Sequence, residues 1–258
     1  MVNLAAVING DTYTISDTHM GHHKVLAFEP IRLEYLSDYN TDVVSECQEV
    51  LNLLETVPQE EHRKHSKINQ ICKYLIDFHD DMIVEKWNSV VGEDDTVIHL
   101  GDFAFRGIEE HTKRLNGNKI LLRGNHDHKS ARTYIEAGWK DVIESVKIII
   151  GDNVFEKTPR TDKYWNGLFK TFDDKTVLLS HYPIYNHNVW DMKKYGPITD
   201  MLAEIYENID GDINIAGHTH SQPFDYENGI SVSIENCTGL RPMKIKDVLM
   251  KYKDSKCL

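Results

Sequence analysis

Metal-binding residue types follow five short apolar runs of this sequence. The runs at 12–16, 96–100, 119–122, 176–180 and 213–216 are brief and rich in β-branched residues or leucine, as strands buried on both faces are. Carboxylate, imidazole or amide side chains come directly after each run. These candidate ligands are Asp17, His19, Asp102, Asn125, His181, His218 and His220.

Each candidate taken singly has an ordinary structural explanation. An aspartate after a strand is often a turn residue or a helix N-cap, and a histidine there can simply be hydrogen-bonded. Taken together these explanations fail, because five independent turns have no common reason to select carboxylates and imidazoles. Ligands bind beyond the carboxyl ends of strands in open α/β sheets, so we predict a metal site at this edge.

The number and type of these ligands favour two divalent ions. Seven protein ligands exceed what one ion usually takes, and oxygen and nitrogen donors without sulfur suit Mn²⁺, Fe²⁺ or Zn²⁺ better than Ca²⁺ or Mg²⁺. Of these we favour Mn²⁺. Two ions about 3.5–4 Å apart turn a bridging water into hydroxide and stabilise the charge of an in-line displacement. The pattern therefore indicates hydrolysis of a phosphate ester.

The motifs resemble those of the calcineurin-like metallophosphoesterase superfamily. The family pattern D-x-H, G-D, G-N-H-D or E, H and G-H-x-H occurs here in order, as Asp17/His19, Gly101/Asp102, Gly124/Asn125/His126/Asp127, His181 and Gly217/His218/His220. The flanking residues are similar to the small bacterial and phage branch. The stretch around residues 39–75 is longer than that branch usually carries.

This resemblance implies a role for each motif residue. One ion would be held by Asp17, His19 and His220, the other by Asn125, His181 and His218, with Asp102 as the bridge. His126 would be no ligand. It would stabilise the phosphoryl oxygens and donate a proton to the leaving oxygen, and Asp127 would orient and charge it.

Several other residues have two interpretations each. Arg106 and His22 are candidate substrate contacts, although Arg106 could pair with a surface carboxylate and His22 could be a solvated loop residue; Arg123 shares the ambiguity of Arg106. Three aromatic residues could wall a nucleobase pocket or be packing: Tyr182, Tyr185 and Trp190. We expect His99 to be a hydrogen-bonded core histidine. We expect three more histidines at the surface: His62, His65 and His79.

Strands that alternate with helical patterns predict an α/β fold, a two-layer mixed β-sheet sandwich flanked by α-helices. We expect one domain over residues 1–258, with a helical insertion at about 30–66. Further strands are expected at 146–150 and 230–234. Helices are expected at 42–54, at 68–91 with Gly92 as the cap, at 129–137, and at 198–209 after Pro197. Asn166-Gly167 and Asn228-Gly229 predict hairpins.

Composition narrows the functional classes. The net charge of −12 repels polyanions and argues against general nucleic-acid binding. No stretch is long enough for a membrane span, and no signal peptide is apparent. The cysteines Cys47, Cys72, Cys237 and Cys257 form no C-x-x-C pair, so we expect free thiols and a cytoplasmic protein. The oligomeric state is open.

The expected activity is phosphate-ester hydrolysis with a small phosphate-ester or nucleotide substrate. Phosphodiesters are favoured, because only Arg106 offers the extra positive charge that a monoester dianion needs. A phosphomonoesterase is the alternative within the same chemistry. A non-catalytic metal-binding scaffold of the same fold would be expected to have lost a ligand or the acid histidine, and the His126–Asp127 pair disfavours a two-metal peptidase or amidase.

Overall fold

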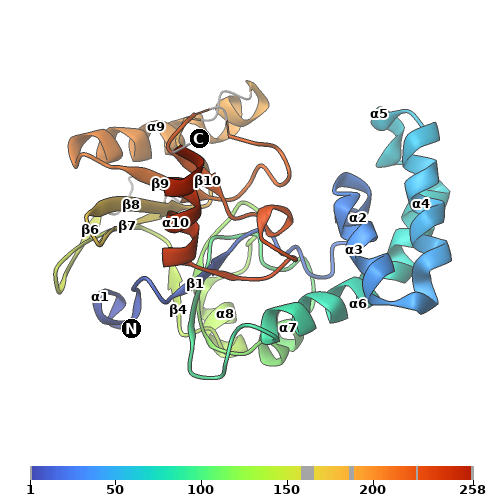
Figure 1. Cartoon of the computed structure of the whole chain (residues 1–258), viewed down its shortest axis with the longest axis horizontal. Helices are drawn as coiled ribbons and strands as arrows, with labels where there is room; N and C mark the ends of the chain where they lie inside the picture. Colours follow the sequence, from blue (N-terminus) through green and yellow to red (C-terminus); the bar gives the residue numbers. More distant parts are fainter. Residues whose placement is uncertain (1, 158–165, 186–188, 225, 257–258) are drawn as a thin grey trace.

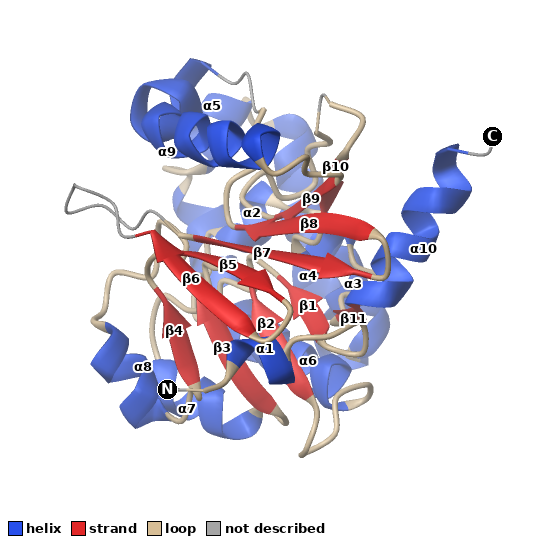
Figure 2. Ribbon diagram, turned by 90° about the vertical axis from the view of Figure 1, so that its left-hand side faces the viewer, coloured by secondary structure: helices blue, strands red, loops and turns tan. Residues whose placement is uncertain are grey.

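Two mixed β-sheets lie face to face and carry helices on their outer sides (Figures 1 and 2). The structure is a computed structural model that describes residues 2–157, 166–185, 189–224 and 226–256. A single hydrophobic cluster includes Ile15 and Ile120 of the first sheet together with Leu168 and Ile213 of the second. The core therefore lies between the two sheets, as the predicted α/β sandwich requires.

The first sheet has the strand order β11-β1-β2-β3-β4. Its strands β1 (Tyr13–Ile15), β2 (Thr96–His99), β3 (Asn118–Leu122) and β4 (Asp141–Ile143) run parallel, and β11 (Met243–Lys244) is antiparallel to β1. The first three coincide with predicted strands to within a residue or two. Because they are parallel, their carboxyl ends meet at one edge.

The second sheet has the order β10-β9-β8-β7-β5-β6. It contains β5 (Val146–Ile150), β6 (Asn153–Lys157), β7 (Gly167–Phe172), β8 (Lys175–Ser180), β9 (Ile213–Ala216) and β10 (Gly229–Ser231). Strands β8, β9 and β10 run parallel, so the loops after β8 and β9 leave the sheet at one edge. A second hydrophobic cluster joins Phe169 and Leu178 to Leu202 of the covering helix α9 (Val189–Asn208).

Five helices form an arm that projects to one side of the sheets in Figure 1. They are α2 (Val25–Phe28), α3 (Ile31–Tyr39), α4 (Val44–Thr56), α5 (Gln59–His62) and α6 (Ser66–Asn88), with a 3₁₀ turn η1 (Thr41–Val43) before α4. The helices α1 (Leu4–Val7), α7 (Ile108–Arg114), α8 (Ala131–Ala137) and α10 (Ile245–Lys256) and the 3₁₀ turn η2 (Ile234–Asn236) complete the chain. Cys47 and Cys72 of the arm belong to the same cluster as the sheet core. That the arm is an insertion within one domain stays a prediction.

Two helix boundaries differ from the predicted ones. Helix α6 ends at Asn88 and not at Gly92, because the Asn88 side chain bonds the backbone of Arg114 and Asn116 and turns the chain there. Helix α9 contains Pro197 in its interior, whereas we expected the helix to begin after it. A proline removes one helical hydrogen bond, and the burial of the α9 face against the sheet offsets that loss.

The hairpin predictions were also wrong or untested. Gly229 begins β10, which pairs in parallel with β9, so Asn228-Gly229 joins no antiparallel strands among the described residues. Residues 164 and 165, which were to precede Asn166-Gly167, lie outside the described residues. A hairpin that we did not predict joins β7 and β8 through Asp173 and Asp174. Asp173 has a φ of 53°, as a tight hairpin turn requires.

Two buried histidines show opposite outcomes. His99 is fully buried and hydrogen-bonded, as predicted: Nδ1 accepts from the Gly101 N–H at 3.1 Å, and Nε2 lies 3.0 Å from the Thr18 hydroxyl. The prediction for His79 was wrong, because its side chain is fully buried. It lies on the inner face of α6, where Asp80 supplies a partner 3.1 Å from Nδ1.

Candidate metal centre

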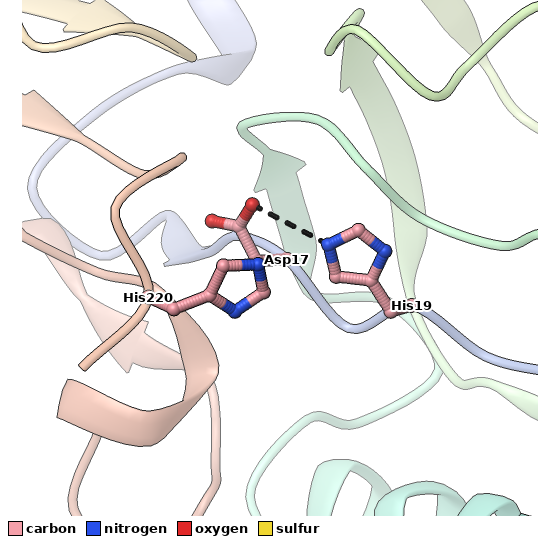
Figure 3. A group of neighbouring side chains, drawn as sticks. All are labelled: Asp17, His19 and His220. Atoms are coloured by element: carbon pink, nitrogen blue, oxygen red, sulfur yellow. Dashed lines mark ion pairs between the residues drawn. The ribbon is translucent and has the colours of Figure 1, made fainter. Parts of the chain in front are cut away.

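The loops that follow β1, β2, β3, β8 and β9 bring the candidate ligands together. Asp17, His19 and His220 each offer an atom within 4.8 Å of the others, and so do Asp17, Asp102 and His181. Figure 3 shows the first group, in which residues about 200 positions apart in the chain converge. The meeting edge is the one that the strand directions require.

The two oxygens of Asp102 face different histidines. Its Oδ2 lies 3.6 Å from His19 Nε2, and its Oδ1 lies 3.7 Å from His181 Nε2. His19 Nε2 is also 3.8 Å from Asp17 Oδ1. Asp102 therefore lies between the two groups of candidate ligands.

The remaining two candidates lie beside His181. Asn125 Oδ1 is 2.9 Å from His181 Nε2, and the ring of His218 is centred 5.1 Å from that of His181. The rings of His19 and His220 stack with centroids 4.9 Å apart. All seven predicted ligands thus lie in one cluster of side chains.

Backbone strain is concentrated at this cluster. Asp17, His19, Asp102, His218 and His220 all have φ between 49° and 72°, the left-handed region that side chains rarely adopt. Eight non-glycine residues in the described part of the chain have positive φ, and these five are among them. Strain of this kind persists where surrounding structure holds it, and it gathers at functional sites.

Two glycines of the motifs are required by close packing. A Cβ on Gly101 would lie 2.5 Å from the Gly124 backbone nitrogen and 2.7 Å from His181 Nδ1. Gly124 is equally constrained, since a Cβ there would meet the backbone nitrogen of Asp102 at 2.6 Å. The second and third motifs can approach each other only because both residues lack side chains.

Burial and neighbouring charges shift the pKa values of Asp17 and Asp102 in opposite directions. Burial opposes ionisation of Asp17, but His220, His181 and a hydrogen bond from the His218 N–H lower the pKa of Asp17 to about 2. Burial, together with the charges of Asp17 and Asp127, raises the pKa of Asp102 well above its usual value. Asp102 therefore needs a positive charge beside it to ionise.

Buried acceptors without partners fit divalent ions at this position. Within the described residues, Asp17 Oδ1 and both ring nitrogens of His19 are buried and make no hydrogen bond. Such groups are costly to bury unless they coordinate or pair. The donor set is oxygen and nitrogen without sulfur, which suits Mn²⁺, Fe²⁺ or Zn²⁺. The residues present therefore fit the predicted ions.

The pair His181 and Asn125 gives a second indication of a cation. His181 Nδ1 lies 2.8 Å from the Leu100 carbonyl oxygen, so it carries the proton and donates it there. Nε2 then presents a lone pair to Asn125 Oδ1, which is also an acceptor. A cation between the two would satisfy both atoms.

Sequence analysis missed Glu235 and Arg32, which lie beside the candidate ligand His220 and support its position. Glu235 Oε1 lies 3.1 Å from His220 Nδ1 and accepts a hydrogen bond from Arg32 Nε at 2.7 Å. Arg32 is fully buried and also donates to the carbonyl oxygens of Asp17 and Thr18. Burial opposes the charge on His220, but Glu235 and Asp17 outweigh it and raise the pKa of His220 to about 9.

One of these two residues had a sequence signal. Glu235 follows the predicted strand 230–234, so it obeys the same rule as the other candidates. Arg32 had no sequence signal, because nothing in the sequence places the arm against the loop after β1. Any ion that His220 held would have to displace a proton from its ring first.

The expected pairing of Asp127 with His126 is wrong. The buried carboxylate of Asp127 accepts from the backbone N–H groups of Asp102 and Gly124 at 2.7 and 2.8 Å, from that of Phe103 at 3.2 Å, and from the Tyr134 hydroxyl at 3.1 Å. Four donors occupy its two oxygens. Asp127 therefore fixes the second and third motif loops against each other, and it does not orient the imidazole of His126.

His126 itself lies at the mouth of the cluster. Its ring is centred 5.6 Å from that of His19 and 4.8 Å from that of Phe105. Burial, with the charges of His128 and His181, lowers the pKa of His126 to about 4. The ring is thus neutral at neutral pH and can still donate one N–H.

The candidate substrate contacts are placed differently from one another. Arg106 Nη2 lies 3.3 Å from Asp77 of α6, in an exposed ion pair. His22 lies against the cluster, with its ring 5.6 Å from that of His19. Arg123 is buried and donates to the carbonyl oxygens of Asp127 and Lys129 and to Glu144.

Two of the three candidate pocket aromatics are described, and both pack within the fold. Tyr182 is buried and stacks on Tyr195. Tyr185 packs against Tyr206 and Tyr226, and its hydroxyl donates to Glu207. The side chain of Trp190 lies outside the described residues. The packing alternative holds for both described tyrosines.

The cysteines are as expected where they are described. Cys47, Cys72 and Cys237 are buried free thiols, and Cys257 lies outside the described residues. Among the helices described, none combines the length and the apolar character needed to cross a membrane.

Comparison with known proteins identifies the family. The calcineurin-like phosphoesterase family model matches residues 12–222, which include all seven candidate ligands. The gene 66 protein of Mycobacterium phage L5 is 30% identical over 175 residues, 62% of this chain and 74% of the phage protein, consistent with the bacterial and phage branch. The crystal structure of the protein of unknown function AQ665 from Aquifex aeolicus covers 93% of this chain and 98% of its own, with a TM-score of 0.56 and 20% identity, a likeness of fold alone. This chain belongs to the calcineurin-like phosphoesterase family.

Proposed function

We propose that this protein is a two-metal phosphoric ester hydrolase that acts on phosphodiesters or nucleotides. The observation that carries the proposal is the position of Asp102, whose two oxygens face His19 on one side and His181 on the other. A scaffold without catalysis would be expected to have lost a ligand or the acid histidine, whereas this sequence has all seven candidates and His126. Two divalent ions, Mn²⁺ by preference, would supply an activated water and neutralise phosphate charge.

The chain's own residues would hold these ions in two sets. Asp17, His19 and His220 form the first set, and Asn125, His181 and His218 the second, with Asp102 common to both. Nδ1 of His220 is held by Glu235, and Nδ1 of His181 is held by the Leu100 carbonyl oxygen, so both ring orientations are fixed. Both rings therefore direct Nε2 toward the cluster.

His126 is proposed to act on the leaving group. Its half-buried ring lies beside the ligand cluster without belonging to it, so its N–H can reach a phosphoryl or leaving oxygen. The approach of an anionic phosphate would favour its protonated form, against the burial that lowers the pKa of His126. His22 and Arg106 are proposed to contact substrate, Arg106 by leaving Asp77.

Phosphodiesters are favoured over monoesters for an electrostatic reason. A monoester dianion needs cations beyond the ions themselves, and Arg106 is the one candidate for this role that the sequence indicates. A cytoplasmic location is proposed on the buried free cysteines. General nucleic-acid binding is not expected of a chain with a net charge of −12.

The test is hydrolysis of a chromogenic phosphodiester and of its monoester by metal-stripped protein, with and without Mn²⁺. We expect turnover that depends on Mn²⁺, that is abolished in Asp102→Ala and that falls about 10²–10⁴-fold in His126→Ala. Turnover of the diester should exceed that of the monoester. Absence of turnover in protein shown to bind two ions would support the non-catalytic scaffold instead.

A further inference from the structure

Two exposed phenylalanines flank the candidate centre. Phe105 is 44% exposed and Phe28 is 36% exposed, and the third exposed phenylalanine of the described residues, Phe155, lies on β6 at the edge of the second sheet. Phe105 belongs to the loop after β2, and Phe28 ends α2 at the root of the arm. Exposed apolar side chains beside a polar centre are typical of ligand sites.

His22 joins these two rings into one surface. Its ring stacks on Phe105, with centroids 3.8 Å apart and planes 13° apart, and approaches Phe28 at 6.3 Å. The Arg63 guanidinium lies 4.7 Å from the centre of the Phe28 ring. We call these four residues, Phe105, His22, Phe28 and Arg63, the aromatic shelf.

The shelf begins where the ligand cluster ends. The Phe105 ring is centred 5.6 Å from that of His19 and 4.8 Å from that of His126. A phosphate at the cluster would thus have the shelf on the side of His126. Because His126 is proposed to protonate the leaving oxygen, the group that departs would be the one in contact with Phe105.

Ring geometry and hydrogen-bonding potential also suit a nucleobase. The shelf offers the exposed ring of Phe105 with the ring of His22 stacked on it. Nδ1 of His22 is buried without a hydrogen-bond partner within the described residues. A planar, polar-edged ring satisfies both features, whereas a lipid chain would use only the apolar surface.

We propose that the aromatic shelf binds the base of a nucleoside leaving group. This inference rests on the proposed function, since it places the phosphate at the metal cluster. It assigns the arm a role through Phe28 and Arg63, which form the outer part of the shelf. Stacking of bases on aromatic side chains tolerates any base, so selectivity among bases is not implied.

The test compares two ligands that differ only in the base. They are the 5′-phosphonate analogues of AMP and of ribose 5-phosphate, whose P–C bond the enzyme does not hydrolyse, titrated calorimetrically into Mn²⁺-loaded protein. We expect the adenine ligand to bind about tenfold more tightly. The ratio should fall toward one in Phe105→Ala and persist in Phe105→Trp. Phe155→Ala is the matched control and should leave the ratio unchanged.

Two results would overturn the proposal: equal affinities in the wild type, or a ratio that Phe105→Ala does not reduce. Hydrolysis of the chromogenic diester by the same proteins separates this outcome from the proposed function. If the diester is hydrolysed and the two ligands bind equally well, the base site is rejected and the proposed hydrolase function stands. A tenfold preference for the adenine ligand without turnover keeps the base site and rejects the hydrolase.

Discussion

Two buried arginines support the two halves of the candidate metal centre in different ways. Arg32 donates to the carbonyl oxygens of Asp17 and Thr18 in the first half, and Arg123 donates to those of Asp127 and Lys129 in the second. Each also pairs with a glutamate. Both side chains are at most 1% exposed.

The two arginines differ in the exposure of their glutamate partners. The side chain of Glu235, the partner of Arg32, is 1% exposed and contacts the candidate ligand His220. The side chain of Glu144, the partner of Arg123, is 43% exposed, and water can stabilise its charge. The first pair therefore links an arm residue to a candidate metal ligand, whereas the second mainly holds the conformation of a loop. A buried ion pair is costly when one partner is lost, and an exposed one is not.

The largest effect is expected from Arg32→Met. This variant takes the guanidinium away from the buried Glu235, which keeps His220 beside it, and from the carbonyl oxygens of Asp17 and Thr18. The free energy of unfolding should therefore fall by about 3–5 kcal/mol. Arg123→Met is the matched variant, and it should cost about 1–3 kcal/mol, because it leaves Glu144 in contact with water. Urea unfolding of both variants measures the difference. Equal losses would mean that the exposure of the partner does not matter here.

The next largest effect is expected on Mn²⁺ affinity, which should fall in a variant of Glu235 and not in a variant of Glu144. Glu235→Gln removes the charge that holds His220, and we expect about 10–100-fold weaker binding of one Mn²⁺ ion. Glu144→Gln should bind Mn²⁺ as the wild type does, since the ion pair of Glu144 is with Arg123, which is not a candidate ligand. Calorimetric titration of metal-stripped proteins checks both. A matching loss in Glu144→Gln would contradict the distinction.

Low pH should destabilise the fold at the first half of the centre, because His99 becomes protonated. Burial lowers the pKa of His99 to about 4 from its ordinary 6.5, and Nδ1 must stay unprotonated to accept the Gly101 N–H. Because the folded pKa is the lower one, this stabilisation is complete above about pH 6.5. It is lost as the pH falls toward 4, by up to about 3 kcal/mol.

His99→Asn tests this pH dependence. The asparagine Oδ1 can still accept from Gly101, but the residue does not titrate, so stability should fall less between pH 7 and pH 5 than in the wild type. Urea unfolding at the two pH values gives the comparison. An unchanged slope would assign the acid sensitivity to other groups.

The smallest effect is expected at the Arg106–Asp77 pair. Both side chains are more than half exposed, so Arg106→Ala and Asp77→Ala should each change stability by at most about 1 kcal/mol. If Arg106 contacts substrate, Arg106→Ala should raise KM and Asp77→Ala should not. An equal rise in both variants would indicate a structural role alone.

Local sequence predicted the ligand cluster better than it predicted the surroundings of that cluster. Asp17 and His181 follow buried parallel strands, and strand direction alone brings such loops to one edge. The support from Arg32 could not be predicted, because it depends on how the arm packs against the loop after β1. The same limit explains His79, whose burial is set by tertiary packing and not by its helix.

Some errors came from treating residues as local signals. Pro197 and Gly92 were used as helix boundaries, but side-chain anchoring by Asn88 and burial of α9 decided the observed ends. We expected Asp127 to orient His126 because the two residues are adjacent in the sequence. Its carboxylate instead serves the backbone of Asp102, Phe103 and Gly124, which only the assembled loops bring near.

The most direct test of the two-half centre is the number of Mn²⁺ ions bound per chain, measured by native mass spectrometry. We predict two ions in the wild type, one in His220→Ala, where the first set loses a ligand, and weakened binding of both in Asp102→Ala. A wild-type chain that binds a single ion, or an Asp102→Ala variant that still binds two at wild-type affinity, would contradict the account.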